Sequence, residues 1–521
     1  MSSTNETESL LARAAAIGLR WIDLEIEKPA GDSASLIPGD FALKHQILPI
    51  RMESDRLLVA IGSLETLSAV DDLSVLIGKP TEPMLGDPGL IREKIEERFL
   101  EDMLGGMSND DQGNVTEIDD STDLADLQKM AAESAVVQMV NFVFAQAVRD
   151  GASDIHIEPY EREVKIRYRI DGMLRDMMKP PKRMHAALVS RLKILGEMNI
   201  AERRLPQDGR IKLTIAGRSV DVRVSIVPTV YGERAVMRIL DKGTAMLGLE
   251  ELGMNSDTLE RFRKVISLPY GIILATGPTG SGKSTSLYAS LQEIYSPATN
   301  ILTIEDPVEY QVPGIGQIQV RANIGLTFAN GLRSIVRQDP DVIMVGEIRD
   351  YETAEIAIHA ALTGHLVFST LHTNDSPGAI TRMMDMGVEP YLVASSLIGV
   401  VAQRLVRRNC PFCSEPFSYT PEALSSVGIN PDEPNMKTMK GKGCEKCQGS
   451  GFKGRQGVYE LLIIDEPIRR MTVDRSSSNV MKEYAIQNQN MRTLLGDGRL
   501  AVMSGKTTPE EVLRVCQREE I

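Results

Sequence analysis

The sequence predicts an α/β protein, and three observations lead to this fold class. The chain has 521 residues, of which 42% are hydrophobic and 25% charged, an ordinary globular composition at a length that suggests three domains of ~150 residues each. From about residue 246, short apolar runs alternate with helical stretches, as in a parallel sheet with helices on its faces. The sequence GPTGSGKST, residues 277–285, stands between the first of these runs and the helical stretch after it.

Residues 1–102 are expected to form a small N-terminal α/β domain. ESLLARAAAIGL indicates a short helix, HQILPIRMESDRLLVAIG two strands joined by a polar turn, and DPGLIREKIEERFL an amphipathic helix. Residues 103–130 are expected to be an acidic linker, because the segment 108–127 contains seven acidic residues and no basic one. A docking strip for a basic partner is the alternative interpretation of this segment.

Residues 131–245 are expected to form a middle domain in which a helix precedes an antiparallel sheet. VKIRYRIDG and RSVDVRVSIV alternate apolar and charged residues, and turns are expected at Asp171-Gly172 and Ala216-Gly217. The inward-facing sets are Val164, Ile166, Tyr168 and Ile170 in the first segment and Val220, Val222, Val224 and Ile226 in the second. The arginine-rich outer face is interpreted either as solvated surface or as a contact for an anion that a neighbour supplies.

Charge and composition limit the classes of partner and the compartment. The formal net charge is −14 and only 4% of the residues are aromatic, so a general nucleic-acid binder is not expected. The N-terminal segment lacks the pattern of a secretory signal, and the apolar stretches are shorter or more interrupted than the ~20 residues that span a bilayer. The sequence therefore predicts a cytosolic protein.

Residues 277–285 have the spacing and the strand–loop–helix context of a phosphate-binding loop. Its glycines permit tight turns that direct backbone N–H groups at phosphates. Lys283 is expected to reach the β- and γ-phosphates of ATP, and Ser284 to hold Mg²⁺. The predicted nucleotide-binding residues are Gly277, Pro278, Thr279, Gly280, Ser281, Gly282, Lys283, Ser284 and Thr285.

Hydrolysis additionally needs a carboxylate that activates water and positive charge that stabilises the transition state. Glu347 follows the apolar run DVIMVG, where this acid is expected, while Gly346 stands where many ATPases have an Mg²⁺-binding aspartate. Magnesium is therefore expected to be held partly through water. Glu305, Asp306 and Glu309 follow another strand, so they are expected at the carboxyl edge of the sheet, where ligands bind.

Two histidines, His365 and His372, flank the run HLVFST. A role in sensing the γ-phosphate is predicted mainly for His372, with ordinary packing as the alternative. His359, inside the preceding helical stretch, is expected to pack.

Four of the five cysteines form two CxxC pairs, Cys410 with Cys413 and Cys444 with Cys447, separated by 30 residues. Four thiolates are the tetrahedral set that zinc prefers, and a metal site is more probable than disulfides in a reducing compartment. A structural zinc site is therefore predicted, with four unligated thiols as the alternative. Cys516 is expected to be an ordinary helix residue.

Taken together, these motifs resemble a known family. GPTGSGKST, TIEDPVEY, DPDVIMVGEIRD and TGHLVFSTLHTND are similar to the Walker A motif, Asp box, Walker B motif and His box of the ATPases that drive type II secretion and type IV pili. GASDIHIEPYE, RYRIDG and PQDGRI resemble the middle domain of that family, and the CxxC pairs its metal-binding insertion. The resemblance is dense over about residues 130–521 and looser over 10–100, where LIPGDFALKHQILPI matches best. The arginine-leucine-glycine start of the version that binds cyclic-di-GMP is absent, so that ligand is not predicted.

The resemblance implies a homo-hexamer of RecA-like ATPase domains (246–521, including a tetracysteine subdomain at 405–455), each preceded by a PAS-like α+β middle domain. ATP would lie between the middle and C-terminal domains, with Glu347 positioning water and Glu309 assisting. The arginines that would meet ATP are Arg210, Arg223, Arg333 and Arg337, with Arg204 and Arg349 as weaker candidates. Ser284 stands where many relatives have threonine, and either hydroxyl can bind Mg²⁺.

GRSVDVRVSIVPTVYGERAVMRILDK and VAQRLVRRNC look closer to the type II secretion E subunit than to the pilus extension motor. The resemblance implies an Mg²⁺-dependent ATPase that passes domain motion to a polytopic inner-membrane platform protein. Its N-terminal domain would dock on the cytoplasmic domain of a bitopic inner-membrane secretion protein. The alternatives are a type IV pilus extension ATPase, a nucleic-acid translocase and a nucleotide-controlled scaffold without useful turnover.

Overall fold

The structure is a computed structural model that describes residues 19–95 with short gaps, 134–241 without 216–217, and 247–516 without 434–435. Its N-terminal part contains a four-stranded sheet in the order β1-β4-β3-β2. These strands and the helix beside them are β1 (Arg20–Trp21), β2 (Ile47–Glu53), β3 (Arg56–Ile61), β4 (Thr81–Leu85) and α3 (Leu67–Ile77). The two strands predicted from HQILPIRMESDRLLVAIG are confirmed as the antiparallel pair β2–β3. The helix predicted from ESLLARAAAIGL and the acidic linker lie outside the described residues.

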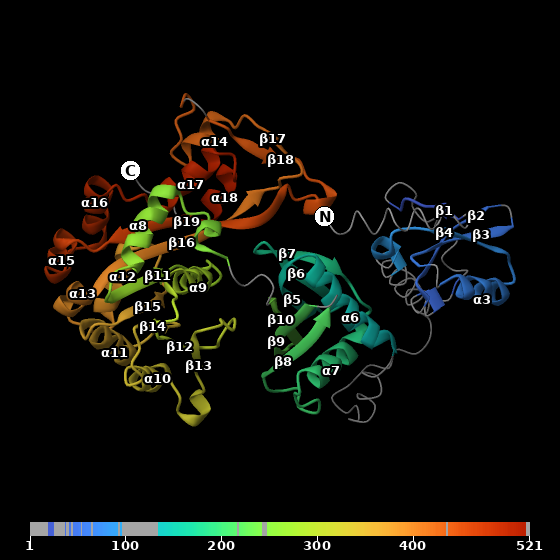
Figure 1. Cartoon of the computed structure of the whole chain (residues 1–521), viewed down its shortest axis with the longest axis horizontal. Coiled ribbons are helices and arrows are strands. Elements are labelled where there is room, and N and C mark those ends of the chain that lie inside the picture. The colour runs from blue at the N-terminus through green and yellow to red at the C-terminus, as the bar shows by residue number, and fades with distance from the viewer. Residues whose placement is uncertain are drawn as a thin grey trace.

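A six-stranded antiparallel sheet in the order β7-β6-β5-β10-β9-β8 forms the middle of the molecule (Figure 1). Its elements are α6 (Ser134–Arg149), β5 (Ala152–Pro159), β6 (Val164–Ile170), β7 (Met173–Met178), α7 (His185–Leu195), β8 (Gln207–Ile215), β9 (Arg218–Thr229) and β10 (Gly232–Asp241). Both predicted inward-facing sets are buried in one core with α6 and α7. The turn at Asp171-Gly172 is confirmed, with positive φ values of 48° and 83° that suit a two-residue hairpin turn.

The C-terminal sheet has seven strands in the order β13-β12-β14-β15-β11-β16-β19, and pairing is parallel except at β16–β19. The strands are β11 (Gly271–Thr276), β12 (Ile301–Glu305), β13 (Gly316–Gln319), β14 (Val342–Val345), β15 (Leu366–Leu371), β16 (Leu397–Asn409) and β19 (Phe452–Ile463). The parallel sheet predicted from the alternating pattern is thereby confirmed. β11 lies between β15 and β16, so its end faces a point where the strand order changes direction.

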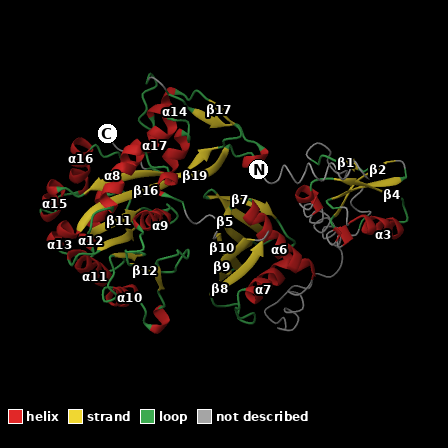
Figure 2. Cartoon of the chain, in the orientation of Figure 1, coloured by secondary structure: helices red, strands yellow, loops and turns green. Residues whose placement is uncertain are grey.

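Helices cover both faces of this sheet (Figure 2). Alternate residues of β11 point to different layers: Ile272 and Leu274 face one core, and Ile273 and Ala275 face the other. The first layer contains α10 (Phe328–Ile335), α11 (Tyr351–Leu362), α12 (Pro377–Asp385), α13 (Pro390–Ser396), α15 (Glu466–Val473) and α16 (Ser478–Gln489). The second contains α8 (Ser256–Ile266) and α9 (Lys283–Ile294).

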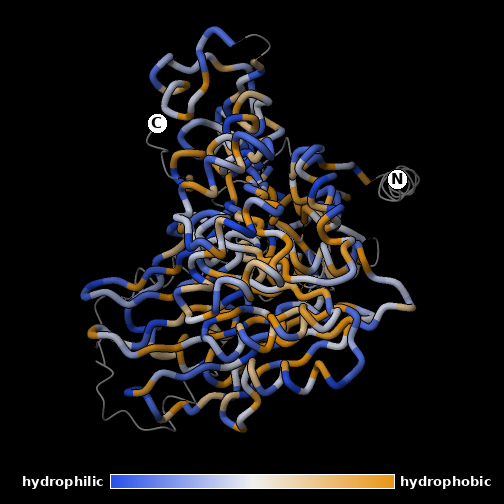
Figure 3. The backbone as a smooth tube through the Cα atoms, turned by 90° about the vertical axis from the view of Figure 1, so that its left-hand side faces the viewer, coloured by the Kyte–Doolittle hydropathy of each residue, from blue (hydrophilic) through white to orange (hydrophobic). Residues whose placement is uncertain are grey.

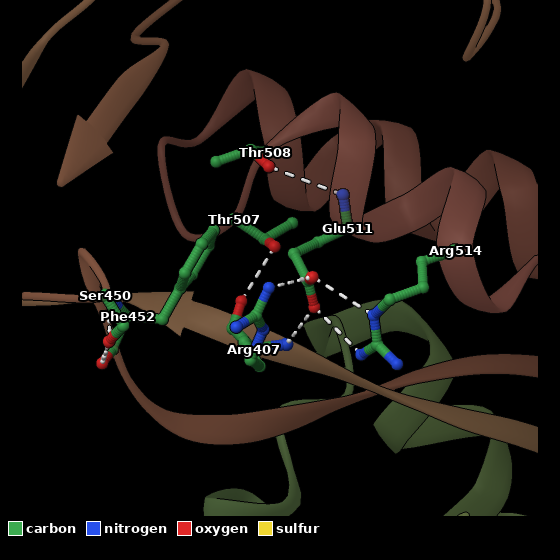
Figure 4. Close-up of polar contacts among 7 residues, drawn as sticks. All are labelled: Arg407, Ser450, Phe452, Thr507, Thr508, Glu511 and Arg514. Carbon is green, nitrogen blue, oxygen red and sulfur yellow. Dashed lines mark hydrogen bonds and ion pairs between the residues drawn. The ribbon is translucent and has the colours of Figure 1, made fainter. Parts of the chain in front are cut away.

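Strands β16 and β19 extend beyond the sheet and carry a small subdomain between them (Figure 1). It contains β17 (Ser414–Pro416), α14 (Pro421–Ser425) and β18 (Met439–Gly441), and it packs on α17 (Leu494–Met503) and α18 (Pro509–Val515). A buried ion cluster fixes the base of this subdomain: Arg407 of β16 and Arg514 of α18 both donate to the Glu511 carboxylate (Figure 4).

Hydrophobic and hydrophilic residues alternate along the described parts of the chain (Figure 3). No helix among the described residues has the length and apolar character needed to cross a membrane.

Candidate functional site

The phosphate-binding loop connects the end of β11 to the start of α9. Gly277, Gly280 and Gly282 have φ values of 146°, 79° and 90°, in the region that favours glycine over every residue with a Cβ atom. The chain therefore turns sharply from β11 into α9, and the N-terminus of α9 lies at the loop. A helix N-terminus with free backbone N–H groups is suited to bind phosphate.

Lys283 lies inside this loop. Its Nζ atom donates to the carbonyl oxygens of Gly277 at 2.7 Å and Pro278 at 3.0 Å. Burial lowers the pKa of Lys283 to about 8, against the opposing effect of the nearby Glu347 carboxylate. Ser284 is exposed in the first turn of α9, where its hydroxyl is available to a metal ion.

Glu347 follows β14 and is held between two side chains. Its carboxylate lies 2.7 Å from Arg349 and 3.6 Å from Nε2 of His372, and its own side chain is 13% exposed. A Cβ atom at Gly346 would lie 3.3 Å from the backbone of Ile304 and of Glu305, so a side chain at this position would require a small shift of β12.

The three carboxylates at the end of β12 and in the segment after it face different surroundings. Glu305 is 4% exposed, and its oxygens accept hydrogen bonds from Tyr288, Thr303 and Gln317. This buried carboxylate joins α9 to β13 through its hydrogen bonds, and the functional role expected from the sequence stays a prediction. Asp306 lines a cleft next to the middle sheet, which Glu305 does not.

The cleft between the middle and C-terminal sheets brings together two of the predicted arginines. Nη1 of Arg223 lies 3.5 Å from Glu309, and its Nη2 donates to the Val308 carbonyl at 2.9 Å. Arg210 donates to Gln319 at 3.2 Å. The cleft has a volume of about 650 Å³, and both arginines line it. Burial lowers the pKa of Arg223, and Glu309 opposes this effect.

Electrostatic interactions connect the cleft to the phosphate loop. Lys283 interacts with Glu347, which pairs with Arg349, and Arg349 in turn interacts with Asp306. Asp306 also interacts with Arg223 of the middle sheet. Opposite charges thus alternate from the loop across the cleft, and a bound polyphosphate would lie within their field.

Other predicted residues lie apart from this set. Arg333 of α10 pairs with Glu352, and Arg337 donates to Ser334; among the described residues neither bonds to the loop or to Glu347. Arg204 pairs with Glu202 at the surface. The ring of His365 bonds to the Ala360 carbonyl at the end of α11, which fits the packing alternative.

Two residues under the loop, Gln403 and Arg404 of β16, are not predicted from the sequence. They are 1% and 9% exposed. The segment VAQRLV gives no local signal that its charged residue is buried, because the strand's burial depends on β11 and β19 at its two sides.

The four cysteines of the CxxC pairs converge, with all four Sγ atoms within 4.8 Å of one another. Sγ distances of 3.9 Å (Cys410–Cys444) and 3.8 Å (Cys413–Cys447) match the edge of a tetrahedron around a metal with metal–sulfur bonds of about 2.3 Å. The Cys447 sulfur accepts from the backbone N–H groups of Cys444 and Gly451. Burial opposes ionisation of Cys447, but these bonds lower its pKa to about 6, whereas burial raises the pKa of Cys413 to about 12; the thiolate therefore forms first at Cys447.

The fold and the loop geometry define a P-loop nucleotide-binding protein. Residues 129–514 match the model of the type II/IV secretion system protein family, and residues 17–103 match the MshEN domain. The chain belongs to the type II/IV secretion system protein family.

Named relatives agree with this assignment. The type IV pilus assembly ATPase PilB of Myxococcus xanthus is 43% identical over 507 residues, which cover 96% of this chain and 88% of that protein. The type II secretion system ATPase E of Vibrio cholerae is 47% identical over 426 residues, 82% of this chain and 84% of that protein. The X-ray structure of the Legionella pneumophila ATPase DotB aligns with a TM-score of 0.54 at 20% identity, over 72% of this chain and 95% of that chain, a likeness of fold.

Proposed function

We propose that the protein is an Mg²⁺-dependent ATPase whose domain motion powers protein export by a type II secretion system. The observation that supports this most directly is the position of Glu347, beside Lys283 of the phosphate loop and linked through Arg349 and Asp306 to Arg223 of the middle sheet. A water-activating acid, a phosphate-binding loop and positive charge from a second domain are the groups that phosphoryl transfer to water requires.

Each group has a distinct task in this proposal. Backbone N–H groups of the loop and Lys283 bind the phosphates. Glu347 orients the attacking water and accepts its proton, and His372 supports the carboxylate from the opposite side. Arg210 and Arg223 approach from the middle domain and stabilise the negative charge that develops on the transferring phosphoryl group. Arg333 and Arg337, exposed on and after α10, remain candidates to reach the site of a neighbouring copy.

Magnesium fits this arrangement through Ser284. Its exposed hydroxyl lies in the first turn of α9, and the glycine at 346 leaves further coordination to water or to Glu347. When bound, the ion neutralises phosphate charge.

The mechanical step is closure of the middle domain on the C-terminal domain. Arg223 contacts the segment after β12 and Arg210 contacts β13, so a change of charge at the loop would act on the middle sheet through Arg349 and Asp306. In the cell, six copies would form a ring at the cytoplasmic side of the inner membrane. The N-terminal domain would dock on a bitopic secretion protein, and the motion would pass to a polytopic platform protein.

Zinc is the metal we assign to the cysteine cluster, since four sulfurs at tetrahedral spacing leave no open position for catalysis. The bound zinc would link the end of β16 to the start of β19, which are far apart in the sequence.

Export is favoured over pilus assembly by the higher identity to the type II secretion ATPase of Vibrio cholerae, at 47%. Pilus extension is the second candidate, because the PilB match extends over 96% of the chain. A strain that lacks this gene would distinguish them: loss of extracellular enzymes with normal pili supports export, and loss of pili with normal enzyme secretion overturns it.

The ATPase itself is tested by Glu347→Gln in the full-length protein with Mg²⁺. Phosphate release should fall at least about 100-fold, as expected when a general base is removed, while ATP affinity stays within about threefold. Glu355→Gln, at a half-buried carboxylate of α11 that accepts a hydrogen bond from Tyr351, is the matched control and should retain full turnover. Phosphate release that is close to background in the wild type and unchanged in Glu347→Gln would favour a nucleotide-controlled scaffold.

A further inference from the structure

Two buried polar side chains lie under the phosphate loop, where the proposed mechanism assigns no residue. β16 pairs with β11 in parallel, with Ala402 opposite Thr276, so Gln403 and Arg404 come directly beside the start of the loop. They are 1% and 9% exposed. A buried amide and a buried guanidinium at one place need a reason, because burying either is costly without strong partners.

Gln403 holds the loop from below. Its Nε2 atom donates to the Ser281 carbonyl at 2.8 Å. A Cβ atom at position 282 would lie 3.0 Å from this nitrogen, and one at position 277 would lie 2.6 Å from the Gln403 carbonyl. Gly277 and Gly282 are therefore required for two reasons: their left-handed backbone, and the close approach of β16.

Arg404 connects the loop to the segment that carries His372. It donates to the carbonyls of Gln403 at 3.0 Å and Asn374 at 2.8 Å, and Asn374 lies two residues after His372. Its Nη1 atom would lie 3.1 Å from a Cβ atom at Gly277. The guanidinium thus fills the space between the first glycine of the loop and the end of β15.

Arg404 forms no close ion pair with a carboxylate in the described parts of the chain, although the carboxylates of Glu460 and Asp375 attract its charge at longer range. The nearby Glu460 carboxylate is already engaged by the N–H and hydroxyl of Ser376, and Asp375 lies 3.8 Å from Lys482. Backbone carbonyls compensate a buried guanidinium only partly. The group that would complete the compensation is an anion bound in the loop on the other side of Gly277.

We propose that Arg404 is a positioning residue of the nucleotide site: its buried charge stabilises bound polyphosphate through the loop, and its bond to Asn374 holds the His372 segment in place. The inference rests on the proposed function, since it assigns this charge to a nucleotide phosphate. It does not require Arg404 to touch the nucleotide. The expected ligand chemistry is a nucleoside di- or triphosphate, with the effect growing with the number of phosphates.

The test compares Arg404→Met with Arg469→Met in the full-length protein. Arg469 is a matched control, because it is a part-buried arginine that donates to a backbone carbonyl, that of Ala394, away from the loop. Affinities for ATP, ADP and AMP are measured with Mg²⁺. Arg404→Met should weaken ATP binding about 10-fold or more, ADP binding less and AMP binding least, whereas Arg469→Met should leave all three within about twofold of wild type.

Arg404→Lys separates the two parts of the proposal. It keeps the charge but loses the planar fork that reaches Asn374. The ratio of ATP to AMP affinity should stay within about threefold of wild type while kcat falls, because the His372 segment is released.

Equal losses for all three nucleotides in Arg404→Met, or no loss, would overturn the electrostatic role. If Arg404→Met does not fold, the Arg404→Lys variant decides. A ratio of ATP to AMP affinity equal to that of wild type supports the electrostatic role, and a ratio close to one overturns it. Failure of wild-type protein to bind ATP would instead overturn the proposed function itself.

Discussion

The nucleotide site and the cysteine cluster are both ligand sites of this molecule, but they are built in opposite ways. The nucleotide site collects residues from the ends of β11, β12, β14 and β15 and from a second sheet. Some of its side chains remain exposed, such as Arg349 at 69% and His372 at 50%. The cysteine cluster takes all four sulfurs from two short turns, and backbone N–H groups cover the Cys447 sulfur. An open site can change its contacts during turnover, whereas a closed one holds the chain in a single geometry.

The two sites share one structural element. β16 passes under the phosphate loop at Gln403 and Arg404 and ends next to Cys410. At its far end, the Cys444–Cys447 turn approaches the middle sheet, where Arg175 donates to Gln448 at 3.0 Å. We therefore expect substitutions in the cysteine cluster to destabilise the fold around it. Substitutions in the nucleotide site should instead reduce ATP binding or hydrolysis.

The largest effect is expected from Cys447→Ser. Structural zinc contributes on the order of 10 kcal/mol in small metal-binding domains, so loss of one thiolate should remove the ion and expose residues 405–455 to proteolysis. Metal analysis should find about one zinc per wild-type chain and almost none in the variant. Cys516→Ser, at a cysteine buried outside the cluster, should keep its zinc. Wild-type protein without zinc would contradict the assignment.

Lys283→Ala should be next in size and should act only on the open site. Loss of a charge-assisted contact to phosphate is expected to weaken ATP binding by about 100-fold, or about 2.7 kcal/mol. Equilibrium binding of a fluorescent ATP analogue measures this loss. Zinc content should stay at the wild-type level, and a variant that lost zinc as well would show that the two sites are not separable.

Glu511→Gln probes the strand that the two sites share. Removing the charge from a buried carboxylate that two arginines contact should destabilise the C-terminal domain by about 2 kcal/mol. Burial would raise the pKa of Glu511, but Arg407 and Arg514 lower it to about 2, below the ordinary value of 4.5. A depressed pKa means that this stabilisation is fully present above about pH 4.5 and is lost as the pH falls toward 2.

Hydrogen exchange of α18 at pH 7 and at about pH 2.5, close to the folded-state pKa of Glu511, measures that effect. Wild-type α18 should lose protection on acidification more than the Gln variant does, because the variant has no carboxylate to protonate. Equal losses would contradict the role of Glu511.

The smallest change should come from Arg223→Ala. Because Arg210 lines the same cleft, part of the positive charge remains, and kcat should fall about 10-fold, which corresponds to about 1.4 kcal/mol. Steady-state phosphate release gives this value, with Arg204→Ala at the exposed Glu202 pair as the control. A larger loss for Arg204→Ala than for Arg223→Ala would contradict the assignment of the cleft.

Local sequence determined the elements and the short-range sites of this protein. Strict alternation predicted β6 and β9, because a period of two fixes which side chains a pleated strand buries. The phosphate loop and the CxxC turns were predictable for a similar reason: their ligands lie within a few residues of one another, so the backbone alone brings them together. Residue spacing therefore predicted the phosphate loop and each CxxC pair, while the fold brings the two pairs, 30 residues apart in the sequence, together.

Only the tertiary structure decided which charges lie together. Glu305, Asp306 and Glu309 are alike in sequence, yet the first is buried against Tyr288, the second lines the cleft and the third meets Arg223. Arg404 and Arg223 are both strand arginines, and the order of strands in two sheets puts one under the loop and the other across the cleft. The physical reason is that burial and pairing of a charge depend on neighbours far away in the chain, which no local pattern records.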